Sequence, residues 1–145
     1  MMKTILATLA TLAILGGLVA ATPAYSAGVE ARIDLSEQRM RVYQNGMLRY
    51  TWKVSTARGG YVTPTGNYRP TRMHTMWYSK KYHNSPMPYS IFFRGGYAIH
   101  GTGAVKALGR PASHGCVRLH PDNARTLFNM VSASGPKNTK ISITH

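Results

Sequence analysis

Apolar and polar side chains alternate along residues 29–35, and a repeat of two residues is the signature of a β-strand. Val29, Ala31, Ile33 and Leu35 are apolar, whereas the residues between them are charged. Successive side chains of a strand point to opposite faces, so this period predicts a strand with one buried face. A fold that starts in this way needs further strands to pair with it.

The following segments supply candidate partners for this strand. Asn45-Gly46 lies between apolar-rich segments, and both residues accept the positive φ of a tight hairpin turn. We therefore expect a hairpin around this turn, with its second strand running through residues 50–54. Further short strands are predicted at 91–93, 97–99 and 140–143.

One amphipathic helix is predicted at residues 121–132. Its apolar residues recur at helical spacing, namely Ala124, Leu127, Phe128 and Val131. Pro121 suits the first helical position, and Asp122 suits the first turn. Residues 71–88 are rich in Met, Tyr, Trp and basic side chains without a clean period, so we expect a loop or lid there. The chain is therefore predicted to be mainly β, with one helix and no second domain.

The first 26 residues have the composition of an export signal. Lys3 gives a basic start, residues 5–21 are mostly apolar, and small residues precede a cleavage point before Ala27. An uncleaved membrane anchor is the alternative, but a membrane span needs about 20 strongly apolar residues. We therefore expect a secretory signal peptide at 1–26 and a single exported domain at 27–145, in the periplasm or cell envelope.

The charge of the chain excludes several kinds of site. Its 145 residues include 18 Lys and Arg against 4 Asp and Glu, a formal charge of +14. No carboxylate lies between Gln38 and Pro121, which argues against calcium cages and against enzymes with paired carboxylates. The single cysteine excludes an intrachain disulfide. A basic chain suits nucleic acid, an anionic membrane or an acidic polymer, and export argues against nucleic acid.

The residues that point to chemistry are His100-Gly101 and, after a spacer of twelve residues, the segment 113–118. A thiol nucleophile needs a base, donors for the oxyanion and a backbone that lets the substrate approach. Cys116, His100 and Gly115 can supply these parts. Because no carboxylate is available to orient the imidazole, we expect a backbone carbonyl to accept its second N–H.

The same residues could instead have a structural or metal-binding role. A lone cysteine is often a small buried hydrophobe. In an exported protein, however, an unpaired thiol with polar neighbours is open to oxidation, and a residue that only fills the core need not carry that risk. A zinc site has enough ligand types but lacks the spaced ligand pairs of structural zinc sites. Its ligands would be His100, His114, His120 and Cys116. We expect no metal there and interpret Cys116 as a nucleophile.

This motif resembles that of the YkuD-type L,D-transpeptidases, a family of bacterial enzymes that crosslink the cell wall. The residues that carry the resemblance are His100-Gly101, Ser113-His114-Gly115-Cys116 and Arg118. Residues 35–46 resemble the family's opening hairpin, 55–66 a conserved turn segment, and 121–131 the helix after the cysteine. The resemblance implies a β-sandwich or barrel-like catalytic domain with one amphipathic helix after the catalytic cysteine.

The resemblance also implies a mechanism. Cys116 would attack the carbonyl between meso-diaminopimelate and the terminal D-Ala of a peptidoglycan tetrapeptide stem, forming a thioester and releasing D-Ala. His100 would act as general base and then acid, oriented by the Gly101 carbonyl, and an amine would resolve the thioester into a 3-3 crosslink. His114 would assist, the Gly115 and Cys116 N–H groups would hold the oxyanion, and Ser113 would brace the loop. Arg118 would position the loop or meet a substrate carboxylate. The family needs no metal or organic cofactor.

Residues around this motif are candidates for contacts with the stem, whose carboxylates suit arginine. The basic residues expected to border the site are Arg72, Lys80, Lys81, Arg94, Lys106 and Arg110. The aromatic candidates for a groove, for which core packing is an equal alternative, are Trp77, Tyr78, Tyr82 and Tyr89. Ser113, Arg118, Arg94 and Tyr89 are taken as candidate substrate-binding residues.

Three other functions fit the same sequence. The acyl-enzyme could pass its acyl group to water, or to an outer-membrane protein that is thereby anchored to peptidoglycan. A basic module without activity could bind the wall electrostatically, with binding that falls steeply as salt rises. The sequence does not indicate an oligomeric state.

Overall fold

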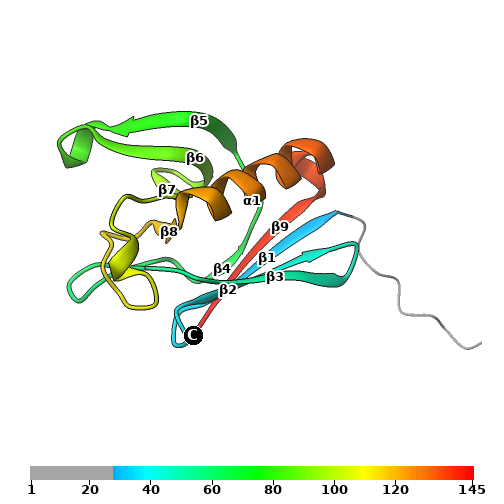
Figure 1. Ribbon diagram of the computed structural model, residues 1–145, viewed down its shortest axis with the longest axis horizontal. Coiled ribbons are helices and arrows are strands. Elements are labelled where there is room, and N and C mark those ends of the chain that lie inside the picture. The colour runs from blue at the N-terminus through cyan, green and yellow to red at the C-terminus, as the bar shows by residue number, and fades with distance from the viewer. Residues whose placement is uncertain (1–27) are drawn as a thin grey trace, which may run out of the picture.

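The computed structural model describes residues 28–145, and the predicted signal peptide at 1–26 lies outside the described residues (Figure 1). The strands form two sheets. The first sheet has the order β3 (Met47–Lys53), β2 (Arg39–Gln44), β1 (Val29–Asp34), β9 (Thr139–Thr144) and β4 (Gly66–Tyr68). The second has the order β5 (Arg72–Ser79), β6 (Ser85–Arg94), β7 (Tyr97–Gly101) and β8 (Val117–Leu119).

The first sheet is built around the alternating segment at the start of the domain. In β1 the apolar residues are buried and the charged residues face outward, as the period of two predicts. The predicted hairpin is also confirmed: β2 and β3 pair antiparallel around Asn45 (φ 50°) and Gly46 (φ 79°). On its other side β1 pairs in parallel with β9, so the start and end of the domain lie side by side.

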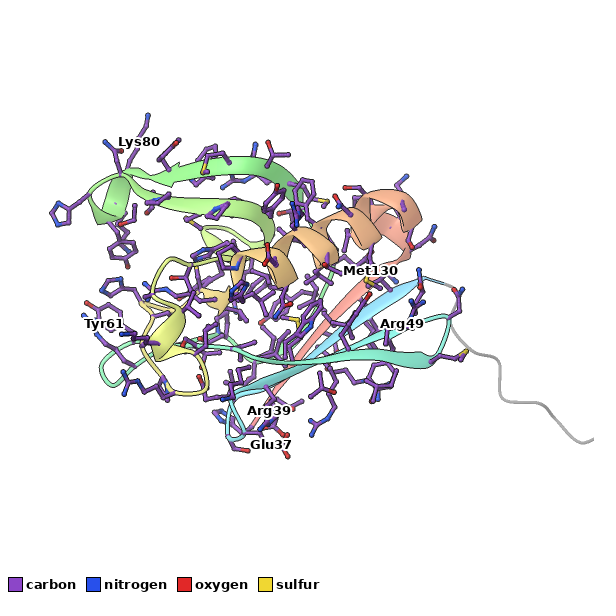
Figure 2. All side chains as sticks on the ribbon, viewed as in Figure 1. Glu37, Arg39, Arg49, Tyr61, Lys80 and Met130 are labelled. Carbon is purple, nitrogen blue, oxygen red and sulfur yellow. The ribbon has the colours of Figure 1, made fainter. Side chains whose placement is uncertain are left out.

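The helix α1 (Pro121–Ser134) joins the two sheets into one core. It packs against β6 and β7 of the second sheet and against β1 of the first. Ala124, Leu127 and Val131 form its buried face, and the space between the sheets is filled by side chains (Figure 2). The predicted helix is confirmed and runs two residues beyond its predicted end.

The prediction of a loop or lid at residues 71–88 is wrong in its secondary structure. The segment forms most of an antiparallel hairpin of β5 and β6, with the 3-10 helix η1 (Lys80–Tyr82) at its tip, where Figure 2 places Lys80. β5 is an edge strand whose two faces are both partly exposed, so no alternation develops. Two prolines and the positive φ of Tyr89 (53°) further hide the strand pattern of β6.

Two short 3-10 helices complete the secondary structure: η2 (Val105–Ala107), between β7 and β8, and η3 (Pro136–Asn138), before β9. The mainly β fold class with one helix after the cysteine is confirmed. Within residues 28–145, no helix has the length and apolar character needed to cross a membrane.

Candidate active site

The parallel pair of β7 and β8 brings the chemically active residues together. His100 on β7 lies opposite Arg118 on β8. Cys116 directly precedes β8, two residues before Arg118, and lines the same cavity as His100 and Arg118. Ile99 and Val117 point the other way and are buried in the core. The core therefore fixes one face of the sheet, and the other face presents the thiol, the imidazole and the guanidinium together.

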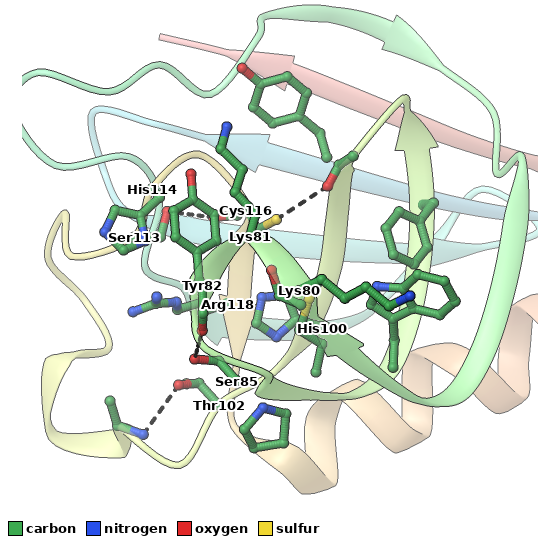
Figure 3. A pocket seen from close by; sticks show the side chains of 18 of the residues that line it. Lys80, Lys81, Tyr82, Ser85, His100, Thr102, Ser113, His114, Cys116 and Arg118 are labelled. Carbon is green, nitrogen blue, oxygen red and sulfur yellow. Dashed lines mark hydrogen bonds between the residues drawn. The ribbon is translucent and has the colours of Figure 1, made fainter.

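These side chains line a cavity of about 710 Å³ (Figure 3). The residues of the predicted motif that line it are His100, Ser113, His114, Cys116 and Arg118. The β5–β6 hairpin supplies another wall, which includes the predicted basic residues Arg72, Lys80 and Lys81. No carboxylate lines the cavity, since the chain's four acidic residues all lie elsewhere.

His100 is held by the backbone beside it. The residue is 6% exposed, and its Nδ1 lies 2.7 Å from the Gly101 carbonyl oxygen. A carbonyl only accepts, so Nδ1 carries the hydrogen and Nε2 of the neutral ring keeps its lone pair. Burial lowers the pKa of His100 to about 4, and the Gly101 hydrogen bond offsets only part of this shift. At neutral pH the imidazole is therefore an uncharged base.

Cys116 is a partly buried free thiol, not a preformed thiolate. Its Sγ lies 3.7 Å from the Gly96 carbonyl oxygen, to which the S–H donates. Burial raises the pKa of the Cys116 thiol, while a backbone hydrogen bond from Ala98 and the charge of Arg118 act in the opposite direction. With the thiol and the His100 imidazole both neutral, nucleophilic attack requires transfer of the thiol proton during the reaction.

Ser113 braces the loop that carries the thiol. Its buried Oγ donates to the Cys116 carbonyl oxygen at 2.7 Å and accepts from the Gly115 N–H at 3.0 Å. Because the Gly115 N–H is committed to Ser113, it is not free to hold an oxyanion. The expected assignment of Gly115 as an oxyanion donor is therefore not supported by its hydrogen bonding, and the Cys116 N–H keeps that assignment.

Thr63 supports the same loop from a distant segment. Its buried hydroxyl donates to the Gly115 carbonyl oxygen at 2.8 Å and accepts from the Ala57 N–H at 3.0 Å. The sequence gave no sign of the contact between Thr63 and Gly115, because these two residues lie about fifty positions apart. The position of Thr63 within the segment 55–66 that resembles the family was the available signal.

His114 packs within a basic and aromatic cluster at the mouth of the cavity. The Tyr82 ring from η1 stacks on it with centroids 4.2 Å apart, and Arg58 Nη2 lies 3.1 Å from its Nε2. Partial desolvation, together with the charges of Arg58, Arg118 and Lys81, lowers the pKa of His114. This neutral ring joins the tip of the β5–β6 hairpin to the loop that carries Cys116.

Several predicted contacts do not reach the cavity. Tyr89 packs against Phe128 of α1, with ring centroids 5.7 Å apart, and does not line it. Arg94 is exposed at the end of β6 and also lies outside the lining. Lys106 and Arg110 do not line the cavity either. The placement of these residues gives no support for a substrate contact.

The possible zinc ligands do not form a metal site. Within residues 28–145, no group of three or more His, Cys, Asp or Glu side chains is arranged to hold a metal ion. His120 has another task, since its Nδ1 accepts the Asp122 N–H and caps α1.

Comparison with known proteins identifies the domain. A family model described as the YkuD L,D-transpeptidase catalytic domain matches residues 29–143. The YkuD protein of Bacillus licheniformis, a candidate L,D-transpeptidase, is 24% identical over 116 residues, which cover 77% of this chain and 63% of that protein.

Solved structures share the fold. An L,D-transpeptidase from Mycobacterium smegmatis has a TM-score of 0.74 at 20% identity, covering 82% of this chain and 59% of that one. An L,D-transpeptidase from Xylanimonas cellulosilytica has a TM-score of 0.69 at 27% identity, covering 85% and 63%. This chain spans less than two thirds of the length of each of these relatives. Because the family model covers most of the chain, the chain belongs to the YkuD family of L,D-transpeptidase catalytic domains.

Proposed function

We propose that this protein is an exported, cysteine-dependent L,D-transpeptidase that forms 3-3 crosslinks between peptidoglycan stems. The observation that carries the proposal is the pairing of Cys116 and His100 in one cavity, with His100 Nδ1 held 2.7 Å from the Gly101 carbonyl. This hydrogen bond leaves Nε2 as a base at the wall of the cavity that the thiol also lines.

In the first half of the reaction Cys116 takes up the acyl group. Its Sγ attacks the carbonyl between diaminopimelate and D-Ala, and the thiol proton passes to His100 Nε2. The C–S bond forms while the carbonyl oxygen becomes an oxyanion, for which the Cys116 N–H is the proposed donor. The C–N bond then breaks, and the imidazolium returns its proton to the departing D-Ala amine.

In the second half an amine of another stem attacks the thioester. His100 Nε2 takes the proton of the attacking amine, the C–N bond forms and the C–S bond breaks. The proton then returns to the Cys116 sulfur, which regenerates the neutral thiol and imidazole of the free enzyme. No metal or organic cofactor has a step in this sequence.

The electrostatics of the cavity suit this substrate. Arg72, Lys80, Lys81 and Arg118 line it, and no carboxylate does. Peptide stems carry free carboxylates, so binding replaces lost solvation with charge-assisted hydrogen bonds. The composition of residues 1–26 supports a place in the periplasm or cell envelope, where such stems occur.

Purified protein given a disaccharide-tetrapeptide is expected to release D-Ala and to yield a dimer with the mass of a 3-3 crosslink. Chromatography with mass spectrometry of the products provides the measurement. Arg94→Gln is the matched control, since Arg94 lies outside the cavity and its loss is expected to leave dimer formation unchanged. Release of D-Ala with tripeptide as the sole product would identify a hydrolase and contradict crosslinking.

A further inference from the structure

One side of the cavity carries an arginine laid over aromatic rings. The guanidinium carbon of Arg72, on β5, lies 3.6 Å from the ring centroid of Phe92 and 4.7 Å from that of Trp77. Both aromatic residues line the cavity with it. Stacking on ring faces is a favourable setting for guanidinium and restricts its orientation. Arg72 is therefore a preorganised cation rather than a freely moving one.

The charge of Arg72 has no carboxylate partner in the described part of the chain. Arg72 takes part in none of the ion pairs found among residues 28–145, and its nearest polar contact is His74 Nε2, 3.4 Å from Nη1. The chain's four carboxylates all contact other side chains. Glu30 pairs with Arg32, Glu37 with Arg41 and Asp122 with Arg125, and Asp34 accepts from Ser36. By contrast, Arg118 in the same cavity already donates to the Ala112 carbonyl.

One apolar cluster contacts both Arg72 and the nucleophile. Phe92, which is 2% exposed, forms a buried cluster with Met87 and Ala98, and the side chains of Trp77 and Cys116 pack against it. The path from the thiol to the guanidinium therefore runs along apolar surface and ends at a positive charge. A ligand that follows this path needs an aliphatic segment next to the reacting carbonyl and a carboxylate at its far end.

The side chain of diaminopimelate has this form, because a short methylene chain leads from the carbon next to its reacting carbonyl to a distal carbon that bears a second carboxylate beside its amine. We propose that Arg72 binds this distal carboxylate of the donor stem, with the methylene chain lying against the apolar part of the cavity wall beside Trp77 and Met87. The inference rests on the proposed function and assigns to Arg72 the selection of donor stems whose distal carboxylate is free. A guanidinium can bind both oxygens of a carboxylate, but gains much less from the neutral amide.

The test compares three donor tetrapeptides on the wild-type protein and on Arg72→Gln. The first carries free diaminopimelate, the second is amidated at the distal carboxylate, and the third is amidated at the terminal D-Ala. The readout is the rate at which Cys116 gains the acyl mass, and a thermal melt of each variant reports folding. Arg94→Gln is the matched control, an exposed arginine of the same hairpin outside the cavity.

Wild type is expected to react about 10- to 100-fold faster with the free donor than with the distally amidated one, the range for a charge-assisted contact. Arg72→Gln is expected to lose this preference, because it slows on the free donor but not on the distally amidated one. It is also expected to slow on the donor amidated at D-Ala, because the distal carboxylate is still present there. Arg94→Gln is expected to match wild type on all three donors, and Arg72→Lys to retain part of the preference.

Two results would overturn the inference while leaving the proposed function standing. One is a wild-type protein that acylates equally fast with the free and distally amidated donors. The other is an Arg72→Gln effect that vanishes when D-Ala is amidated, which would assign Arg72 to the leaving group. If no donor acylates wild-type Cys116, the proposed function fails and takes this inference with it.

Discussion

Replacement of His100 by alanine is expected to slow acylation of Cys116 by about 10²- to 10⁴-fold, the usual contribution of a positioned general base. Burial raises the pKa of the thiol, so little thiolate forms at neutral pH without a base. The fold is expected to persist, because the ring lines the cavity and its one hydrogen bond is to the Gly101 carbonyl. Single-turnover mass spectrometry gives the rate, and a thermal melt gives the folded fraction.

The pH profile distinguishes loss of this base from a general disturbance. The His100 pKa is lowered to about 4, so the ring is neutral above that pH and protonated below it. Wild-type acylation should therefore persist through pH 6 and fall as the pH drops through about 4. His100→Ala should lack this acid limb. An acid limb near the ordinary histidine pKa of about 6.5 would contradict the burial of the acting base.

Gly115→Ala is expected to lower the free energy of unfolding by about 3 kcal/mol or more and to reduce acylation with it. A Cβ at Gly115 would lie 2.6 Å from the Tyr97 ring and 2.7 Å from the Val62 carbonyl oxygen. The φ of 133° is also one that an L side chain rarely adopts. The neighbours would have to move, and the loop that carries Cys116 would move with them.

Urea unfolding followed by circular dichroism measures this cost. Gly59→Ala is the matched control, because a Cβ at Gly59 meets nothing within 4 Å and its φ is not positive. If Gly115→Ala is as stable as Gly59→Ala, the close packing around this glycine does not constrain the loop.

The elements that could be predicted from the sequence are those with one buried and one exposed face. β1 and α1 each repeat an apolar residue at their own period, because one face meets the core and the other meets water. β5 lacks such a repeat because it is the edge strand of its sheet and both of its faces are partly exposed, and the inner strand β6 is interrupted by two prolines. Tyr89, with its positive φ, also shifts the order of side chains along β6.

Contacts in the candidate site between residues close in sequence could likewise be predicted, whereas contacts between distant segments could not. His100 and Gly101 are neighbours in sequence, and the segment around them contains no carboxylate. A backbone carbonyl could therefore be predicted as the acceptor for the imidazole N–H. The contacts of Thr63 with Gly115 and of Tyr82 with His114 join distant segments, and they depend on how the sheets pack.

The structure also gives a different reason for a glycine at position 115. The sequence suggested that Gly115 leaves room for an acyl carbonyl, whereas the structure places Tyr97 and Val62 where its side chain would be. Three of the basic residues expected at the site do line the cavity, because the β5–β6 hairpin forms one of its walls. They are Arg72, Lys80 and Lys81. Arg94 lies on the same hairpin but beyond the cavity, at the turn into β7.

The central claim, that Cys116 carries the acyl group, is tested most directly by the intact mass of the protein after exposure to a tetrapeptide stem. Wild type is expected to gain the mass of the stem minus D-Ala, as a thioester that peptide mapping places on Cys116. Cys116→Ala is expected to show neither the added mass nor release of D-Ala. Release of D-Ala by Cys116→Ala at the wild-type rate would contradict the account.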